Sequence, residues 1–413
     1  MSDYFPEEVV IEILSRLPTK SLVRFLLVSK SWQSLISSPN FIAAHLNHVR
    51  QSKIPNSSSL SLVRLYNIFC NKENYALYSE AGVDGGSGRN SKLCFPVKLE
   101  YGILRMVGTC DGLLYLSDNH HRENNYIWNP SIRRYVKLPP PTNPPSNFTS
   151  VTGFGSDCRG DYKVVRVVYC EGDGGDLTLP PEVEVYSLST GFWRRLLNVE
   201  IDAFISFAGT THAPLNGAWH WISYSPHRAA DGGCLCLILR FDIANELFSE
   251  IMLPDELSLV NCLNLVVNVY MGQLCVTANH VRGYEYIWVM KQYGVKESWT
   301  RLFTIDLAKC AGGFVGFRKN DIVAFTNQGH GLVTFDPQTG KSRDLAIYNG
   351  VARPLDIDDF EETLVLLGRQ NANVEEVIKE FVDDLEEDGP TNEQEIMLVN
   401  MLSTLMNGLR GFN

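Results

Sequence analysis

The chain has 413 residues and a formal net charge of −11; this length exceeds what one hydrophobic core usually organises, so at least two structural units are expected. Its composition is that of an ordinary globular protein. There is no apolar run behind a basic cluster at the N-terminus, and the longest apolar stretches, such as Cys234 to Leu239, fall far below the roughly 18 residues that a membrane-spanning helix needs. These features argue against a secretory or membrane class and predict a soluble protein of the cytoplasm, the nucleus or both.

The negative charge lies almost entirely at the C-terminal end. Residues 354–413 contain fifteen Asp or Glu against three Lys or Arg, a balance of −12 that leaves about +1 for the rest of the chain. Because no basic stripe occurs in that remainder, nucleic acid is not expected as a partner.

The cysteines and histidines do not form a metal-binding pattern. The ten cysteines are scattered without CxxC spacing, and Cys234 and Cys236 have the two-residue spacing of one face of a strand. The nine histidines contain no HExxH motif, and the adjacent His120 and His121 would point to opposite sides of a strand or lie in a loop. We expect reduced thiols, no bound metal and no cofactor.

The first fifty residues have the pattern of several short helices. Four apolar residues at helical spacing predict the first helix, and they are Val10, Ile13, Leu14 and Leu17. Pro18 ends this helix. Thr19 and Ser29 are expected to cap a second and a third helix. Pro39 breaks the third, and Asn40 is expected to cap a fourth.

Such helices need a surface to pack against. Helices of under a dozen residues are marginal alone in water, and a forty-residue unit buries too small a fraction of its surface to be comfortably stable. The apolar positions also cover more than one face of each helix. Periodicity alone leaves two partners open, the rest of this chain or another protein.

A family resemblance favours another protein. It is carried by Phe5-Pro-Glu-Glu-Val-Val-Ile-Glu-Ile-Leu-Ser-Arg-Leu-Pro18, Lys20-Ser-Leu-Val-Arg24, Val28-Ser-Lys-Ser-Trp32 and Leu35-Ile36. These strings resemble the F-box of plant F-box proteins, although that family usually opens with Leu-Pro where this chain has Phe5-Pro6. The resemblance implies binding to the Skp-type adaptor of Skp–cullin–F-box ubiquitin ligases and, through it, to cullin. The positions that match the family's adaptor-facing residues are Pro6, Ile11, Leu14, Leu17, Pro18, Leu22, Val28, Lys30, Trp32 and Leu35.

Beyond a Ser-rich linker the helical period disappears, and short runs rich in Val, Ile, Leu, Tyr and Trp are separated by Gly, Pro, Asn and Asp, as in strands and turns. Five of these runs hold an aromatic residue at the same place, at intervals of roughly fifty residues: Trp128, Tyr186, Phe241, Trp288 and Phe335. Tyr78 is a candidate for a degenerate first unit. Further aromatics follow the first four at Tyr135, Trp193, Phe248 and Trp299, and aliphatics follow all five at Leu138, Leu196, Ile251, Leu302 and Leu345.

A β repeat of this length predicts a β-propeller, in which the phased aromatic and aliphatic residues fill the space between blades. For Trp128, Trp193 and Trp299 we therefore favour core packing over ligand stacking.

The same stretch carries a second resemblance. Its matching motifs include Asn129-Pro-Ser-Ile-Arg-Arg-Tyr-Val-Lys-Leu-Pro139, Gly153-Phe-Gly155 and Leu215-Asn-Gly-Ala-Trp-His-Trp221. They are similar to the F-box-associated interaction domain of plant F-box proteins. The resemblance implies substrate recruitment but identifies no substrate residues, and since the paired glycines of true kelch repeats do not recur in phase, the domain is kelch-like.

The sequence contains only incomplete matches to catalytic motifs. Gly340-Lys-Ser342 lacks the first glycine of a phosphate-binding loop and is interpreted as a turn between two strands. Asp242 and Asp336 recur in phase and are better explained as turn-forming residues than as an acid/base pair. No nucleophile has recognisable activating neighbours.

The acidic end has two amphipathic stretches. The first holds Val374, Val377, Ile378, Phe381 and Leu385, and the second holds Ile396, Val399, Leu402, Leu405, Met406 and Leu409. One interpretation is that they pack on the propeller or are partly disordered; another is a docking element for a substrate or a second copy.

Together these patterns predict an α+β multidomain chain. It comprises a helical F-box (1–50), a linker (51–61), a mainly β, kelch-like propeller with six blades as a working number (62–368) and a short acidic helical tail (369–413). We expect a non-catalytic substrate receptor. The alternatives are an interaction protein that sequesters its partner, and a propeller that hosts an enzyme or binds a glycan. The target cannot be inferred from the sequence.

Overall fold

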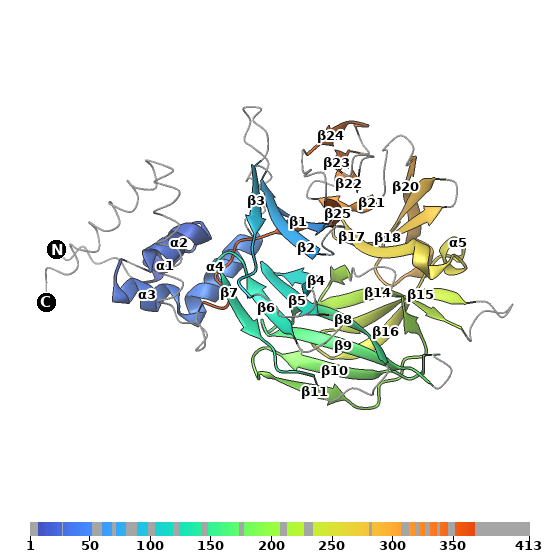
Figure 1. Ribbon diagram of the computed structural model, residues 1–413, viewed down its shortest axis with the longest axis horizontal. Helices are drawn as coiled ribbons and strands as arrows, with labels where there is room; N and C mark the ends of the chain where they lie inside the picture. Colours follow the sequence, from blue (N-terminus) through green and yellow to red (C-terminus); the bar gives the residue numbers. More distant parts are fainter. Residues whose placement is uncertain are drawn as a thin grey trace, which may run out of the picture.

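The computed structural model describes residues 7–26, 28–51, 60–67, 72–79, 89–97, 104–118, 124–141, 148–172, 177–206, 213–226, 234–280, 283–306, 314–318, 322–326, 331–336, 339–345 and 352–367. A unit of four helices, here the helical unit, lies beside a larger β-domain (Figure 1). This confirms the predicted order of a helical segment followed by a mainly β body. The predicted acidic tail lies outside the described residues.

The helical unit consists of α1 (Glu7–Leu14), α2 (Thr19–Phe25), α3 (Lys30–Ile36) and α4 (Pro39–Gln51). Ser29 caps α3 as predicted, because its side chain accepts a hydrogen bond from the backbone N–H of Trp32 at 3.3 Å. Inside the unit the rings of Phe25 and Trp32 meet edge to face, with centroids 5.0 Å apart. The short helices thus form one small core.

Two of the predicted caps were wrong. Thr19 is the first residue of α2 and is buried, while Pro18 precedes it without a side-chain cap. Pro39 begins α4, because proline lacks the N–H that a first helical turn leaves unpaired. The hydroxyl of Ser38, not the side chain of Asn40, therefore accepts the hydrogen bond from Phe41 N at 3.2 Å.

The β-domain is built from antiparallel sheets, and the described residues form six of them. The first sheet has the order β25 (Ala352–Phe360), β1 (Leu60–Asn67), β2 (Lys72–Ser79) and β3 (Arg89–Leu93). The second has β4 (Leu104–Cys110), β5 (Leu113–Asp118), β6 (Asn125–Asn129) and β7 (Arg134–Lys137). The third contains β8 (Phe148–Ser156), β9 (Tyr162–Cys170), β10 (Glu182–Ser187) and β11 (Phe192–Leu196).

The remaining sheets follow in chain order. The fourth contains β12 (Phe204–Ile205), β13 (Ala213–Leu215), β14 (Ala218–Ser225), β15 (Leu235–Asp242) and β16 (Leu247–Met252). The short helices α5 (Asp255–Ser258) and η1 (Cys262–Asn264) connect it to the fifth, which contains β17 (Leu265–Tyr270), β18 (Gln273–His280), β19 (Tyr284–Met290) and β20 (Trp299–Asp306). The short helix η2 (Lys296–Ser298) lies between β19 and β20. The sixth contains β21 (Phe314–Arg318), β22 (Ile322–Thr326), β23 (Leu332–Phe335) and β24 (Ser342–Asp344).

The first sheet joins the two ends of the β-domain. Strand β25 pairs with β1 in a register that sets Leu60 opposite Phe360. The first strands of neighbouring sheets contact one another, β4 against β8 and β21 against β25, as in a propeller whose sheets are arranged around an axis. The start of β1 at Leu60 also places the beginning of the β-domain two residues earlier than predicted.

The phased aromatic residues occupy equivalent strands. Trp128, Tyr186, Phe241, Trp288 and Phe335 lie on the third strand of their sheets, and Tyr78 lies on β2, the third strand of the first sheet. Three of them sit directly opposite the next aromatic, in the pairs Trp128 with Tyr135, Tyr186 with Trp193 and Phe241 with Phe248. The repeat predicted from the sequence therefore corresponds to the repeat of the sheets.

Leu302 departs from this phase. Its counterparts Leu138, Ile251 and Leu345 are buried, whereas Leu302 is 41 % exposed. The register of β19 and β20 shifts beside it, so that Phe303 faces Ile287 and Arg301 faces Trp288. Leu302 is thus the extra residue of a β-bulge, which turns its side chain outward.

Indole N–H groups link neighbouring sheets. Trp193 donates from Nε1 to the carbonyl of Pro139 at 2.8 Å, and Trp299 donates to Met252 at 3.0 Å. Trp219 donates likewise to Phe154 at 2.9 Å, and an added Cβ at Gly155 would lie 2.9 Å from the same indole nitrogen. Together with the burial of Trp128, these contacts confirm that Trp128, Trp193 and Trp299 are packing residues.

Candidate adaptor interface

Helix α1 presents apolar side chains to solvent. Val9 is 39 % exposed and Ile13 is 47 % exposed, while Val10 and Ile11 are half-buried. Aliphatic side chains on an exposed helix face cost free energy unless a partner covers them. This exposed apolar face of α1 is the strongest candidate for a protein contact within the helical unit.

The ten predicted adaptor-facing residues fall into four groups. Ile11, Leu17, Val28 and Leu35 are half-buried, Pro18 and Lys30 are exposed, Leu14, Leu22 and Trp32 are buried, and Pro6 lies outside the described residues. The half-buried and exposed residues are accessible to a partner in this conformation. The three buried residues instead hold the helices in place. An adaptor contact for any of them stays a prediction.

The sequence prediction missed two exposed residues. Val9 was not singled out, and Ile13 was named only as one of the apolar residues at helical spacing. The available signal was the breadth of the apolar pattern, because Val9 and Val10 with Ile11 and Ile13 cover more of α1 than one buried face requires.

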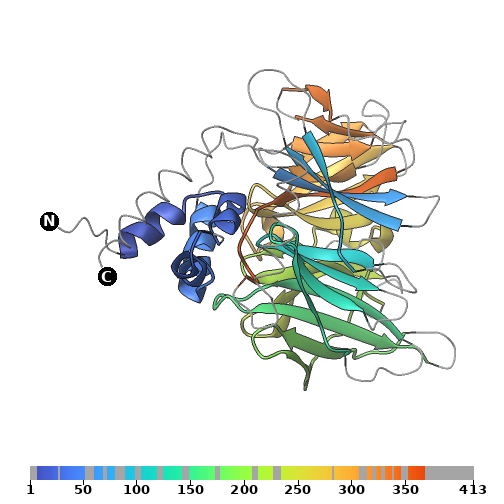
Figure 2. The ribbon, with the colours of Figure 1, turned by 60° about the vertical axis from the view of Figure 1, so that its left-hand side comes forward.

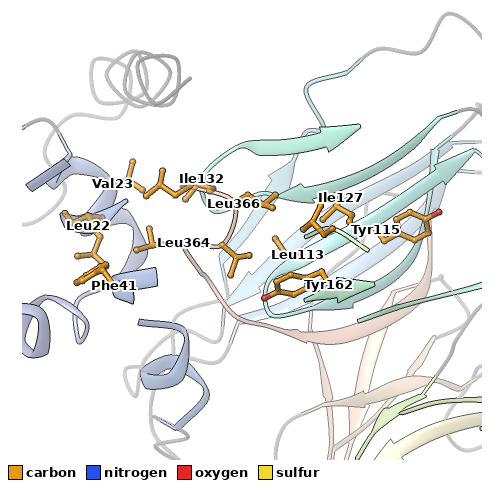
Figure 3. Close-up of a cluster of buried hydrophobic side chains, with 14 of the residues drawn as sticks. Leu22, Val23, Phe41, Leu113, Tyr115, Ile127, Ile132, Tyr162, Leu364 and Leu366 are labelled. Atoms are coloured by element: carbon orange, nitrogen blue, oxygen red, sulfur yellow. The ribbon is translucent and has the colours of Figure 1, made fainter. Parts of the chain in front are cut away.

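The segment after β25 runs between the helical unit and the β-domain (Figure 2). We call residues 361–367 the strap. Figure 3 shows Leu364 and Leu366 of the strap between Leu22 and Val23 on one side and Leu113 of the β-domain on the other. All belong to one buried cluster. The helical unit therefore shares its core with the C-terminal part of the chain.

Asn129 holds the strap on the second sheet. Its side-chain amide donates to the carbonyl of Thr363 at 3.0 Å and to that of Val365 at 2.8 Å. The Thr363 hydroxyl donates in turn to the carbonyl of Asp111 at 2.9 Å. Gly112 has a φ of +72°, and an added Cβ there would overlap the carbonyl oxygen of Glu361. The tight β4–β5 turn thus lets the strap approach closely.

An ion pair adds a second link between the two parts. Arg50 at the end of α4 donates from Nε and Nη2 to the two carboxylate oxygens of Asp111, at 2.9 and 2.6 Å. The hydroxyl of Tyr162 donates to the same carboxylate at 3.0 Å. The hydrogen bond to Asp111 raises the pKa of Arg50. A bidentate contact of this kind fixes the orientation of α4 relative to the β4–β5 turn as well as its position.

Elsewhere, the predicted turn residues behave as expected. The Asp242 carboxylate accepts hydrogen bonds from the backbone N–H groups of Ala244 and Asn245, and Asp336 accepts one from Thr339. Gly340 lies in the turn between β23 and β24 with a φ of +68°. These contacts confirm the interpretation of both motifs as turns.

Several described groups have shifted pKa values, and those of Glu285 and Cys262 lie near neutral pH. Burial raises the pKa of Glu285 to about 7, and a hydrogen bond from the Cys236 thiol lowers the pKa of Cys262 to about 6. In the part of the chain that the structure describes, no group of three or more His, Cys, Asp or Glu residues could hold a metal ion. No helix in that part is long and apolar enough to cross a membrane.

Comparison with known proteins identifies both parts. Residues 3–43 match the F-box domain, and residues 88–366 match the F-box associated beta propeller domain. The F-box protein CPR1 of Arabidopsis thaliana is 30 % identical over 370 residues, which cover 83 % of this chain and 84 % of the relative. The F-box/kelch-repeat protein At3g23880 of the same plant is 27 % identical over 309 residues, covering 73 % of this chain and 79 % of the relative.

Proposed function

This chain belongs to the F-box proteins that carry an F-box-associated β-propeller domain, and from that premise we propose that it is a substrate receptor of a Skp–cullin–F-box ubiquitin ligase. It binds the Skp-type adaptor through the helical unit and cullin through that adaptor. The β-domain recruits a protein target for ubiquitination. Such a protein works in the cytoplasm or nucleus and catalyses no reaction itself.

The observation that carries the proposal is the exposed apolar face of α1. Val9 and Ile13 lie on the first helix of the F-box match, where an adaptor surface would cover them. Full burial of a fully exposed aliphatic side chain contributes roughly 1.5–3 kcal/mol, and covering the part of Val9 and Ile13 that is still exposed contributes roughly half of that for each residue. The half-buried residues nearby, such as Ile11 and Leu17, extend the same contact.

The β-domain contributes by holding the bound target close to the ubiquitin-charged enzyme of the ligase. The strap and the Arg50–Asp111 ion pair join the helical unit to the β-domain at two points, so a bound target is held in a defined direction from the adaptor. Holding a target lysine near a reactive thioester raises its effective concentration and needs no catalytic residue on this chain.

A target surface is favoured at the end of the β-domain that faces away from the helical unit. The connection from β16 to β17 lies there (Figure 1), and in it Leu259 is 67 % exposed and Leu263 is 60 % exposed. Two exposed leucines within one short connection favour a protein contact more than a single exposed leucine does, since single ones are normal on any surface.

The experiment compares target lifetime in cells expressing the wild-type chain or the double variant Val9→Ser, Ile13→Ser. Both positions are exposed, so the fold should persist. Loss of target ubiquitination and a longer target lifetime in the double variant support the receptor. The alternative, a protein that binds and sequesters its partner, predicts equal lifetimes, and that result would contradict our proposal.

A further inference from the structure

The strap delivers the C-terminal end of the chain to the helical unit. Its last residues, Leu366 and Leu367, are buried in the cluster that contains Leu22 and Val23 of α2 (Figure 3). Burial raises the pKa of Glu362 in the strap, and the charge of Lys20, at the start of α2, opposes this rise. Residues 368–413 therefore begin beside the F-box and not at the far end of the β-domain.

The α1 end of the helical unit, whose Leu14 lies in the same buried cluster as Leu366 and Leu367, combines exposed aliphatic and basic side chains. Val9 and Ile13 form the exposed apolar face of α1. Arg16, just after α1, and Lys20, at the start of α2, are exposed as well, and the Arg16 side chain is 62 % accessible even when paired with Glu12. An acidic amphipathic segment matches such a surface in both respects.

The sequence beyond the strap contains a segment of that chemistry. Val374, Val377, Ile378, Phe381 and Leu385 follow helical spacing. Between them stand acidic residues, among them Glu376, Glu380 and Asp384. Residues 368–373 can span about 20 Å when extended, whereas an eight-residue helix such as α1 is only about 12 Å long. Since Leu14 of α1 shares a buried cluster with Leu367 at the end of the strap, a link of this length lets the segment lie along α1 of its own chain.

We propose that residues 374–385 dock within the same chain on the exposed apolar face of α1, with their acidic side chains toward Arg16 and Lys20, and so compete with the Skp-type adaptor. The competition rests on the proposed function; the docking does not. Because the segment is tethered, its effective concentration at α1 is in the millimolar range. Even weak docking then reduces the fraction of chains that can bind an adaptor.

The test uses the full chain with the triple variant Val377→Ser, Ile378→Ser, Phe381→Ser. The matched control is Leu402→Ser, Leu405→Ser, Met406→Ser, which removes three apolar side chains from the second amphipathic stretch without changing charge. Hydrogen exchange of α1 amides reports docking without any adaptor. We expect faster exchange in α1 for the first variant and no change for the control.

Adaptor affinity is measured on the same proteins. The first variant should bind the adaptor about tenfold more tightly than the wild type, and the control should match the wild type. Unchanged α1 exchange in the first variant would overturn the docking, as would α1 protection that rises with protein concentration, since that marks a second copy as the occupant. Faster α1 exchange with unchanged adaptor affinity would overturn the competition. If no form binds the adaptor, the proposed function and the competition both fail, while the exchange result still decides the docking.

Discussion

The helical unit and the β-domain bury their apolar side chains against different parts of the molecule. In the β-domain each sheet packs its aromatic residues against the next, and indole N–H groups such as those of Trp193 and Trp299 bond to the neighbouring sheet. The helical unit completes its core with the strap and leaves Val9 and Ile13 uncovered. The difference indicates that the sheets away from the junction pack only within the β-domain, whereas the helical unit depends on the strap inside the chain and on a partner outside it.

The largest expected effect is the loss of Trp32 from the helical unit. Trp32→Ala removes a buried indole that packs on Phe25 and should cost about 3–5 kcal/mol of local stability. Hydrogen exchange would show faster exchange in α1–α4 while amides of β18 and β19 stay protected, because the buried clusters of those strands contain no residue of the helical unit.

The matched control at this position is Trp32→Phe. It keeps a ring against Phe25 and removes an indole nitrogen that has no hydrogen-bond partner within the described ranges, so it should cost much less. Exchange that rises equally in β18 and β19 after Trp32→Ala would show that the two regions unfold together, and would contradict the comparison.

The next effect concerns a buried carboxyl group inside the β-domain. Glu285 of β19 is buried, and its folded-state pKa of about 7 lies above its ordinary value. Between the ordinary pKa of 4.5 and the folded-state pKa of about 7, the folded state binds more protons than the unfolded state. The free energy of unfolding therefore falls as the pH rises through this window. At pH 8 the buried charge should cost about 3 kcal/mol.

Glu285→Gln should therefore stabilise the protein at pH 8, and the gain should shrink toward pH 5. Denaturant unfolding at both pH values measures this, with the exposed Glu256→Gln as the control. A gain that is the same at pH 5 and pH 8 would contradict the assigned titration of Glu285.

The smallest effect concerns the link between the regions. Arg50→Met removes the two hydrogen bonds to Asp111, but the Arg50 side chain is 44 % accessible, so the loss should be about 1 kcal/mol or less. The control Arg16→Met breaks the fully surface pair with Glu12 and should have almost no effect. Thermal unfolding at low and high salt measures both, and equal effects would mean that Arg50 adds nothing to the junction.

Local patterns in the sequence predicted much of this architecture. Pro18 and Pro39 mark helix boundaries, Ser29 caps α3, and the phased aromatics fall on the third strands, because each depends on neighbours within a few residues or on a regular repeat. Leu302 was misassigned because a β-bulge is a property of paired strands.

The junction was harder to predict because its contacts are not local. Asn129 was assigned only to a family motif, yet its partners Thr363 and Val365 are more than 230 residues away. The pairing of Arg50 with Asp111 likewise has no local pattern. Within the candidate interface, the sequence indicated that the helices need a partner, while the fold was required to show which apolar residues stay exposed.

The central claim is tested most directly by the equilibrium affinity of the full chain for a Skp-type adaptor. The wild type is compared with Val9→Ser, Ile13→Ser and with a matched pair of exposed changes in the β-domain, Met271→Ser, Leu302→Ser. We predict that the wild type and the matched pair bind alike and that the α1 variant binds at least about tenfold more weakly. Equal binding by all three proteins, or no binding by the wild type, would contradict the account.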